Sequence, residues 1–141
     1  HRTGWTCKSC DVASVAGLVA PSAGHTLYGA SKSFLIKFSE ALALENVHNG
    51  VKVCALCPGF TYSEFHDVNG TREMISQLPG FLWLDAKDVV SDTIKAMSRE
   101  KVNPVLIPGW QYKAIVFINR YLPWLSRILT RRTARHFRVT D

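Results

Sequence analysis

A long helical segment that leads directly into a buried strand constrains the fold of this chain more than any other feature. The helix is expected to begin near His25 or Thr26 and to end at Asn49-Gly50, where glycine can form a left-handed cap. An apolar strand over 51–57 follows at once. A helix joined to a buried strand is typical of α/β proteins with a parallel sheet.

Two further strands and a second helix complete this pattern. Strands are expected near 11–14 and near 104–107, the second one flanked by prolines. Asp85 is predicted to cap a helix between them. The buried face of that helix is predicted to hold Val89, Val90, Ile94 and Met97. The sequence therefore predicts part of a doubly wound parallel sheet, Rossmann-like, with right-handed crossovers.

A hydroxyl, a phenol and an ammonium occur close together in the first third of the chain. Tyr28 and Lys32 are four residues apart and so share one face of the predicted helix. A nearby fixed ammonium favours the phenolate, which would allow Tyr28 to exchange a proton with a substrate oxygen. Ser14, just beyond a strand, could hydrogen-bond the same oxygen. A surface helix with a half-buried tyrosine beside a solvated lysine is the alternative interpretation of the pair.

The surroundings of this pair carry more information than its spacing. Ser14-Val-Ala-Gly17 precedes it, and Pro58-Gly-Phe-Thr-Tyr-Ser63 follows the strand over 51–57. In this order, residues 11 to 109 resemble the short-chain dehydrogenase/reductase family. The resemblance implies an NAD- or NADP-dependent oxidoreductase that acts on a carbonyl or alcohol.

The resemblance also implies roles for particular residues. Ser14, Tyr28 and Lys32 would be catalytic, with Lys32 also holding the nicotinamide ribose. The residues after the strand would contact the cofactor, with the Pro-Gly turn lining the nicotinamide; they are Pro58, Gly59, Phe60, Thr61 and Ser63. Ser63 stands where the family most often has threonine, and it keeps the hydroxyl.

The region from Thr61 to Leu84 would cover the substrate. Its aromatic and apolar residues favour an apolar carbonyl or alcohol substrate, although they could equally anchor the loop on the sheet; they are Tyr62, Phe65, Phe81, Leu82 and Trp83. His66 is interpreted as a surface residue rather than a catalyst.

The nucleotide-binding features of the family are missing from this sequence. Gly4 is the only glycine before Ser14, so the glycine-rich turn that cradles a pyrophosphate has no counterpart. The chain is therefore expected to be the C-terminal half of such an enzyme: a non-matching segment over 1–10, a catalytic half over 11–109 and a basic aromatic helical tail over 110–141. A truncation or frameshift near residue 11 is hypothesised, and a catalytically inactive remnant is the alternative.

Composition sets broad limits on location and metal content. The chain is 47% hydrophobic and 20% charged, with neither a signal peptide nor a membrane-spanning run in view, so a cytoplasmic location is expected, with peripheral membrane contact as an option. Cys7/Cys10 and Cys54/Cys57 resemble zinc-binding pairs. Residues three apart in a strand point to opposite faces, however, so no metal site is predicted and the thiols are interpreted as structural.

The net charge of +6 lies in the tail, since residues 110–141 hold seven basic residues and one acidic residue. The tail is expected to dock on protein; contact with an anionic membrane through 110–138 comes second, and nucleic acid is the least favoured partner. The 26–48 helix carries an apolar stripe interpreted as core, with homodimerisation as a second interpretation. That stripe consists of Phe34, Leu35, Phe38, Ala41 and Leu42.

Overall fold

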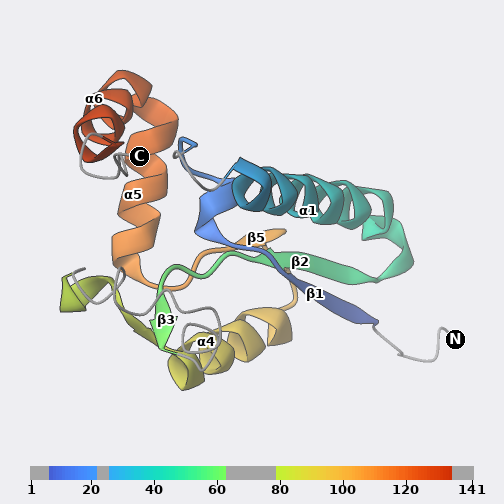
Figure 1. The fold of residues 1–141 in the computed structure, drawn as a ribbon. Coiled ribbons are helices and arrows are strands. Elements are labelled where there is room, and N and C mark those ends of the chain that lie inside the picture. The colour runs from blue at the N-terminus through green and yellow to red at the C-terminus, as the bar shows by residue number, and fades with distance from the viewer. Residues whose placement is uncertain (1–6, 22–25, 63–78, 135–141) are drawn as a thin grey trace, which may run out of the picture.

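Three parallel strands with helices on both faces form the centre of the structure (Figure 1). They are β1 (Lys8–Val12), β2 (Lys52–Leu56) and β5 (Val105–Leu106), in the order β1-β2-β5. The structure is a computed structural model, and it describes residues 7–21, 26–62 and 79–134. The predicted α/β class with a parallel sheet is confirmed.

The central strand, β2, is buried on both faces, as its continuous apolar sequence predicts. One face packs against α1 (Thr26–Glu45), which lies along the sheet in Figure 1. The core on that side consists of Ala13, Ile36, Ala55 and Cys57. β2 also ends within one residue of its predicted bounds at each end.

The first strand lies earlier in the chain than predicted, at Lys8–Val12 rather than near 11–14. Its register pairs Lys8 with Lys52 at the start of β2. Backbone hydrogen bonds to β2 hold this strand in the sheet. Because most of its side chains are at least partly exposed to solvent, the strand can form without a buried run of β-branched residues. The strand therefore includes residues 8–10, which lie in the segment that was expected not to match and outside the predicted strand.

The long helix, α1, begins at Thr26 as predicted. It ends at Glu45, so the predicted end at Asn49-Gly50 is wrong. A separate short 3₁₀ turn over Val47–Asn49 leads to Gly50. Gly50 has φ of 70° and ψ of 13°, which is the left-handed conformation expected of the cap.

The face that α1 turns toward the sheet differs from the predicted stripe. Ile36 and Ser39 are its buried residues, whereas Phe34 and Phe38 are exposed and stack on each other with ring centroids 6.1 Å apart. The interpretation of those two rings as core is wrong. The helix has apolar residues on more than one side, and the pattern alone does not say which side meets the sheet.

The second helix, α4 (Ala86–Ser98), covers the opposite face of the sheet. Asp85 caps it as predicted, because its carboxylate accepts a hydrogen bond from the Lys87 amide at 2.7 Å. Val89 and Met97 are buried as predicted. Val90 and Ile94 are exposed, so that part of the predicted face is wrong; the helix is rotated so that they point to solvent.

Two short strands and two helices complete the described fold. β3 (Thr61–Tyr62) pairs in parallel with β4 (Leu84–Asp85), and a 3₁₀ turn, η3 (Gly80–Leu82), precedes β4. The tail forms α5 (Trp110–Tyr121) and α6 (Pro123–Ala134), which pack on each other. Of the helices described, none is long and apolar enough to cross a membrane.

Candidate active site

Ser14 lies directly beyond the carboxyl end of β1 and begins the 3₁₀ turn η1 (Val15–Gly17). Its Oγ accepts a hydrogen bond from the Ala16 amide at 3.2 Å, and the residue is only 8% exposed. The backbone is extended at this residue, so the strand passes smoothly into the turn. Because the oxygen is held as an acceptor, the hydroxyl proton remains available for donation.

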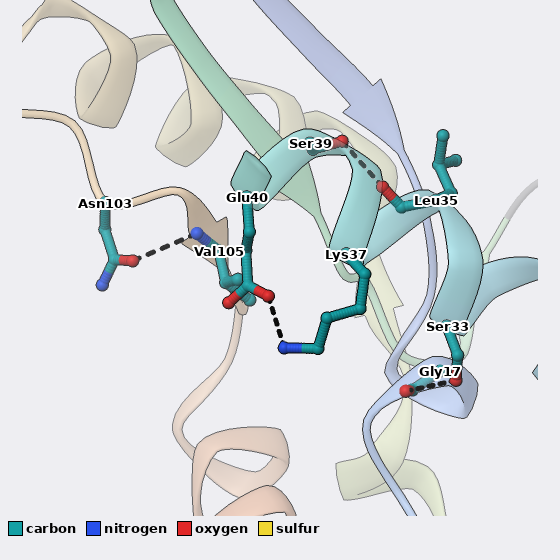
Figure 2. Close-up of polar contacts among 8 residues, drawn as sticks. All are labelled: Gly17, Ser33, Leu35, Lys37, Ser39, Glu40, Asn103 and Val105. Carbon is teal, nitrogen blue, oxygen red and sulfur yellow. Dashed lines mark hydrogen bonds and ion pairs between the residues drawn. The ribbon is translucent and has the colours of Figure 1, made fainter. Parts of the chain in front are cut away.

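The turn is pressed against α1 at Gly17. A Cβ at this position would lie 2.7 Å from the backbone of Lys32 and of Ser33, so only glycine allows the approach. The Ser33 hydroxyl donates to the Gly17 carbonyl at 2.7 Å, which Figure 2 shows. The glycine of the Ser-x-x-Gly segment therefore sets the distance between the Ser14 turn and the helix.

Tyr28 and Lys32 lie together on the first turns of α1. The Lys32 Nζ is 5.6 Å from the centroid of the Tyr28 ring, and it donates to the Val12 carbonyl at 3.2 Å. Tyr28 is 45% exposed, so its ring remains accessible. The structure thus places the lysine beside the tyrosine and links it to β1 two residues before Ser14.

The Pro-Gly turn after β2 adjoins the Ser14 turn. The Val15 amide donates to the Pro58 carbonyl at 3.1 Å, which continues the alignment of the two strands beyond the sheet. Carboxyl ends of neighbouring parallel strands are the usual position of ligand sites in open α/β sheets. Ser14 and Pro58 therefore share the edge where a site is expected.

Tyr112 of α5 fixes this turn, a role that no local pattern in the sequence indicates. Its hydroxyl accepts a hydrogen bond from the Phe60 amide at 2.9 Å and donates to the Leu82 carbonyl. Its ring lies against Gly59, where a Cβ would come within 1.9 Å of the ring. Burial raises the pKa of Tyr112, while the Phe60 amide opposes the rise.

Gln111, next to Tyr112, also reaches the loop region and donates to the Phe81 carbonyl at 3.0 Å. Both residues stand in the segment that was interpreted as a basic aromatic tail. A contact across 52 residues, such as that between Phe60 and Tyr112, leaves no local signal in a single sequence.

The remaining predicted cofactor contacts are only partly described. The Thr61 hydroxyl donates to the Gly59 carbonyl at 3.1 Å, so it stabilises the turn from within. Ser63 lies outside the described residues, as do Phe65 and His66. Of the predicted substrate-loop rings, Tyr62 stacks on Trp83 with centroids 4.6 Å apart.

A family model described as short chain dehydrogenase matches residues 10–73. An uncharacterized oxidoreductase of Myxococcus xanthus (strain DK1622) is 43% identical over 58 residues, which is 41% of this chain and 22% of that protein.

Solved structures of short-chain dehydrogenases share the fold over more of the chain. A short-chain dehydrogenase from Streptomyces avermitilis superimposes with a TM-score of 0.66 at 21% identity, covering 92% of this chain and 52% of that one. A short-chain dehydrogenase from Sphingobium yanoikuyae in complex with NADPH gives a TM-score of 0.62 at 26% identity, covering 83% and 44%.

The family model and the Myxococcus protein support the short-chain dehydrogenase/reductase family for this chain, and the solved structures show that it shares the fold of short-chain dehydrogenases. The chain spans about half of the length of the Streptomyces protein and 22% of the Myxococcus protein.

Proposed function

We propose that this chain carries the catalytic part of an NAD- or NADP-dependent short-chain dehydrogenase/reductase that acts on a carbonyl or alcohol. The observation that supports this most is the arrangement of Lys32, which lies beside the Tyr28 ring and donates a hydrogen bond to Val12, the last residue of β1. Lys32 thus links the Tyr28 ring to the carboxyl end of β1, beyond which Ser14 lies, and this supports a site formed by the three side chains.

Each of the three side chains has its own part in the proposed reaction. Tyr28 exchanges the proton of the substrate oxygen, for which its exposed ring is suited. Lys32 assists Tyr28 from one turn further along α1, where its ammonium lies beside the ring. Ser14 donates its hydroxyl proton to the same substrate oxygen, since the bond from the Ala16 amide uses the oxygen as an acceptor and leaves the O–H available.

The residues present fit the nicotinamide end of a dinucleotide. An ammonium has three N–H donors, and the Val12 carbonyl takes one of those of Lys32, so donors remain for ribose hydroxyls. Pro58, Gly59 and Phe60 would line the nicotinamide. A bound dinucleotide would supply or accept the hydride.

Relatives support both forms of the cofactor. The Sphingobium structure contains NADPH, and a 4-hydroxyisoleucine dehydrogenase mutant was solved with NADH and succinate. We therefore propose NAD or NADP without a choice between them. The exposed rings of Tyr62 and Phe81 support an apolar substrate, since they stand on the elements that flank the Pro-Gly turn.

Cofactor binding is tested with nicotinamide mononucleotide. This ligand lacks the adenosine half and the pyrophosphate of a dinucleotide, so it does not require the glycine-rich turn. Chemical-shift changes in NMR spectra are expected at the Ser14 and Pro58 turns, with a Kd of about 1 mM. Lys32→Ala should remove them, whereas Lys37→Ala, on the same helix and 80% exposed, should not. A folded chain that shows no changes would favour an inactive remnant.

Catalysis is tested on the longest form of the protein that its locus encodes, with cyclic and aromatic ketones and each reduced dinucleotide. Tyr28→Phe should lower kcat by about 10²- to 10⁴-fold, because the proton donor is lost. Tyr121→Phe, an exposed tyrosine of α5, is the matched control and should leave kcat unchanged. Equal activity of Tyr28→Phe and wild type would refute the assignment.

A membrane-surface role is a second candidate, supported by the exposed side chains of α5 and α6. Four aromatic rings are exposed on these helices, namely those of Trp110, Phe117, Tyr121 and Trp124. The exposed basic residues Lys113, Arg120, Arg127 and Arg131 lie among them, and the sequence has no acidic residue from 110 to 134. Exposed aromatic rings among basic residues suit the interface of an anionic bilayer.

Liposome flotation tests this role. The chain should float with vesicles that contain phosphatidylserine at low salt, and high salt should release it. Trp124→Ala should weaken flotation, whereas Phe81→Ala, an exposed ring outside these helices, should not. Absence of flotation on anionic vesicles at low salt rules out the membrane role.

A further inference from the structure

Two cysteines lie directly opposite each other on β1 and β2. Cys10 and Cys54 are register partners in the parallel ladder, and their Sγ atoms are 3.3 Å apart. Side chains alternate along a strand, so residues paired in register project to the same face. The two thiols therefore face each other across adjacent strands, on the side of the sheet that α4 covers.

A third sulfur restrains the inner thiol. The Met97 Sδ of α4 lies 3.1 Å from the Cys54 Sγ, and Cys54 is fully buried. Cys10 is only partly buried, so a small oxidant has access to it but not to its partner. The pair plays no part in the proposed site, whose residues gather beyond the carboxyl end of β1.

We propose that Cys10 and Cys54 are an oxidisable thiol pair that closes to a disulfide across β1 and β2. The sulfurs need to approach by little more than an ångström to reach the usual S–S length of about 2.05 Å. Neighbouring strands are about 4.8 Å apart, within the Cα separation that disulfides span. The other cysteines are less suited, because Cys57 faces α1 and Cys7 is exposed at the strand end.

A peroxide supplies the oxidising equivalents in two balanced steps. The Cys10 thiolate attacks one peroxide oxygen and becomes a sulfenic acid, and the other oxygen leaves as water after taking up the thiol proton. The Cys54 sulfur then attacks the Cys10 sulfur, the S–S bond forms, and its proton leaves with the hydroxyl as a second water. Two thiols and one peroxide thus give one disulfide and two waters.

Peptide mapping of the peroxide-treated chain tests the proposal directly. Trypsin cleaves after Lys8, Lys32, Lys52 and Arg72, so Cys10 falls in peptide 9–32 and Cys54 in peptide 53–72. A cross-linked pair of these two peptides should form, two hydrogens lighter than their sum and separated again by dithiothreitol. Peptide 53–72 also contains Cys57, so the Cys57→Ser variant should retain the link and Cys54→Ser should lose it.

Two further measurements test whether Cys7 forms the link instead and whether the link stabilises the fold. Cys7→Ala should still form the link, which excludes a pairing of Cys7 with Cys10. The oxidised chain should melt at a Tm about 5 °C or more above that of the reduced chain, because the bond closes a long loop of the unfolded state. The proposal is overturned if Cys10 and Cys54 remain open to alkylation after unfolding of the treated chain, or if Cys10 links to Cys7.

Discussion

Gly17 shows how a single residue sets the geometry of the candidate site. It has no Cβ, and this allows η1 to approach the backbone of α1 at Lys32 and Ser33. Ser14 and Lys32 are brought to the same end of β1 by this contact. The glycine is thus part of the site without any chemistry of its own.

Gly17→Ala should destabilise the fold, because the new Cβ would lie 2.7 Å from two backbone atoms that cannot move independently. We expect the free energy of unfolding to fall by about 1–3 kcal/mol, measured by urea denaturation. Gly80→Ala is the control, since its Cβ would meet nothing within 4 Å, and it should change that energy by less than about 0.5 kcal/mol. Equal effects of the two variants would contradict the packing argument.

Tyr112→Phe should also destabilise the fold, for a different reason. The variant leaves the Phe60 amide and the Leu82 carbonyl without their shared hydroxyl. Unsatisfied groups of this kind cost about 1–3 kcal/mol when water cannot replace the lost partner. Tyr121→Phe, exposed on the same helix, should leave the urea midpoint unchanged. A Tyr112→Phe variant as stable as the wild type would show that water substitutes for the hydroxyl.

Local spacing in the sequence was enough to single out the candidate residues, whose catalytic roles are a proposal. Tyr28 and Lys32 were found because a helix brings residues four apart together, and Ser14 because it follows a strand. Tyr112 was not predicted, since its contacts with the Pro-Gly turn arise only when α5 folds back on η3. Its position in a basic, aromatic segment suggested a different role.

For the helices, the sequence predicted the capping residues better than it predicted which side of each helix is buried. The Asp85 cap was predicted, because it depends on one residue and its nearest neighbours. The left-handed conformation of Gly50 was predicted too, but Gly50 ends the 3₁₀ turn over Val47–Asn49 and not α1. The buried faces of α1 and α4 were only partly predicted, since apolar residues occur on more than one side of each helix. Tertiary contacts decide between the sides.

The exposed side of α1 is proposed to mediate homodimerisation. It presents three exposed apolar side chains on one side, namely Leu27, Phe34 and Phe38. We expect Phe34→Lys to weaken self-association at least tenfold in sedimentation equilibrium, because a charge would be buried in the interface. Lys37→Gln, on the same helix, should leave association unchanged. A wild-type chain that sediments as a monomer at all concentrations would refute this proposal.

At the scale of the whole molecule, the sequence predicted the order of strands and helices and the parallel sheet. Right-handed crossovers and short connections leave few alternatives for such an order. The sequence did not predict that β1 begins within the polar N-terminal segment. A strand that is held mainly by backbone pairing with its neighbour, and not by buried side chains, leaves little hydrophobic pattern in the sequence.

The stability of the whole chain should depend on pH through its buried thiols. Burial raises the pKa of Cys54 and of Cys57 from 9.0 to about 12 each. In the unfolded chain both thiols ionise near 9, so the folded state holds more protons between these values. The stability that the protonated thiols contribute is fully present below about pH 9 and is lost as the pH rises toward 12.

Urea denaturation at a series of pH values from about 8 to about 10.5 measures this dependence. The free energy of unfolding should fall with pH, each buried thiol adding up to about 1.4 kcal/mol per pH unit above its unfolded pKa. Lysines and tyrosines also ionise in this range, so the slope must be compared between variants. Cys57→Ser removes one buried thiol and should flatten the slope, whereas Cys7→Ser removes an exposed one and should not. Identical slopes in all three proteins would show that water reaches the Cys57 thiolate.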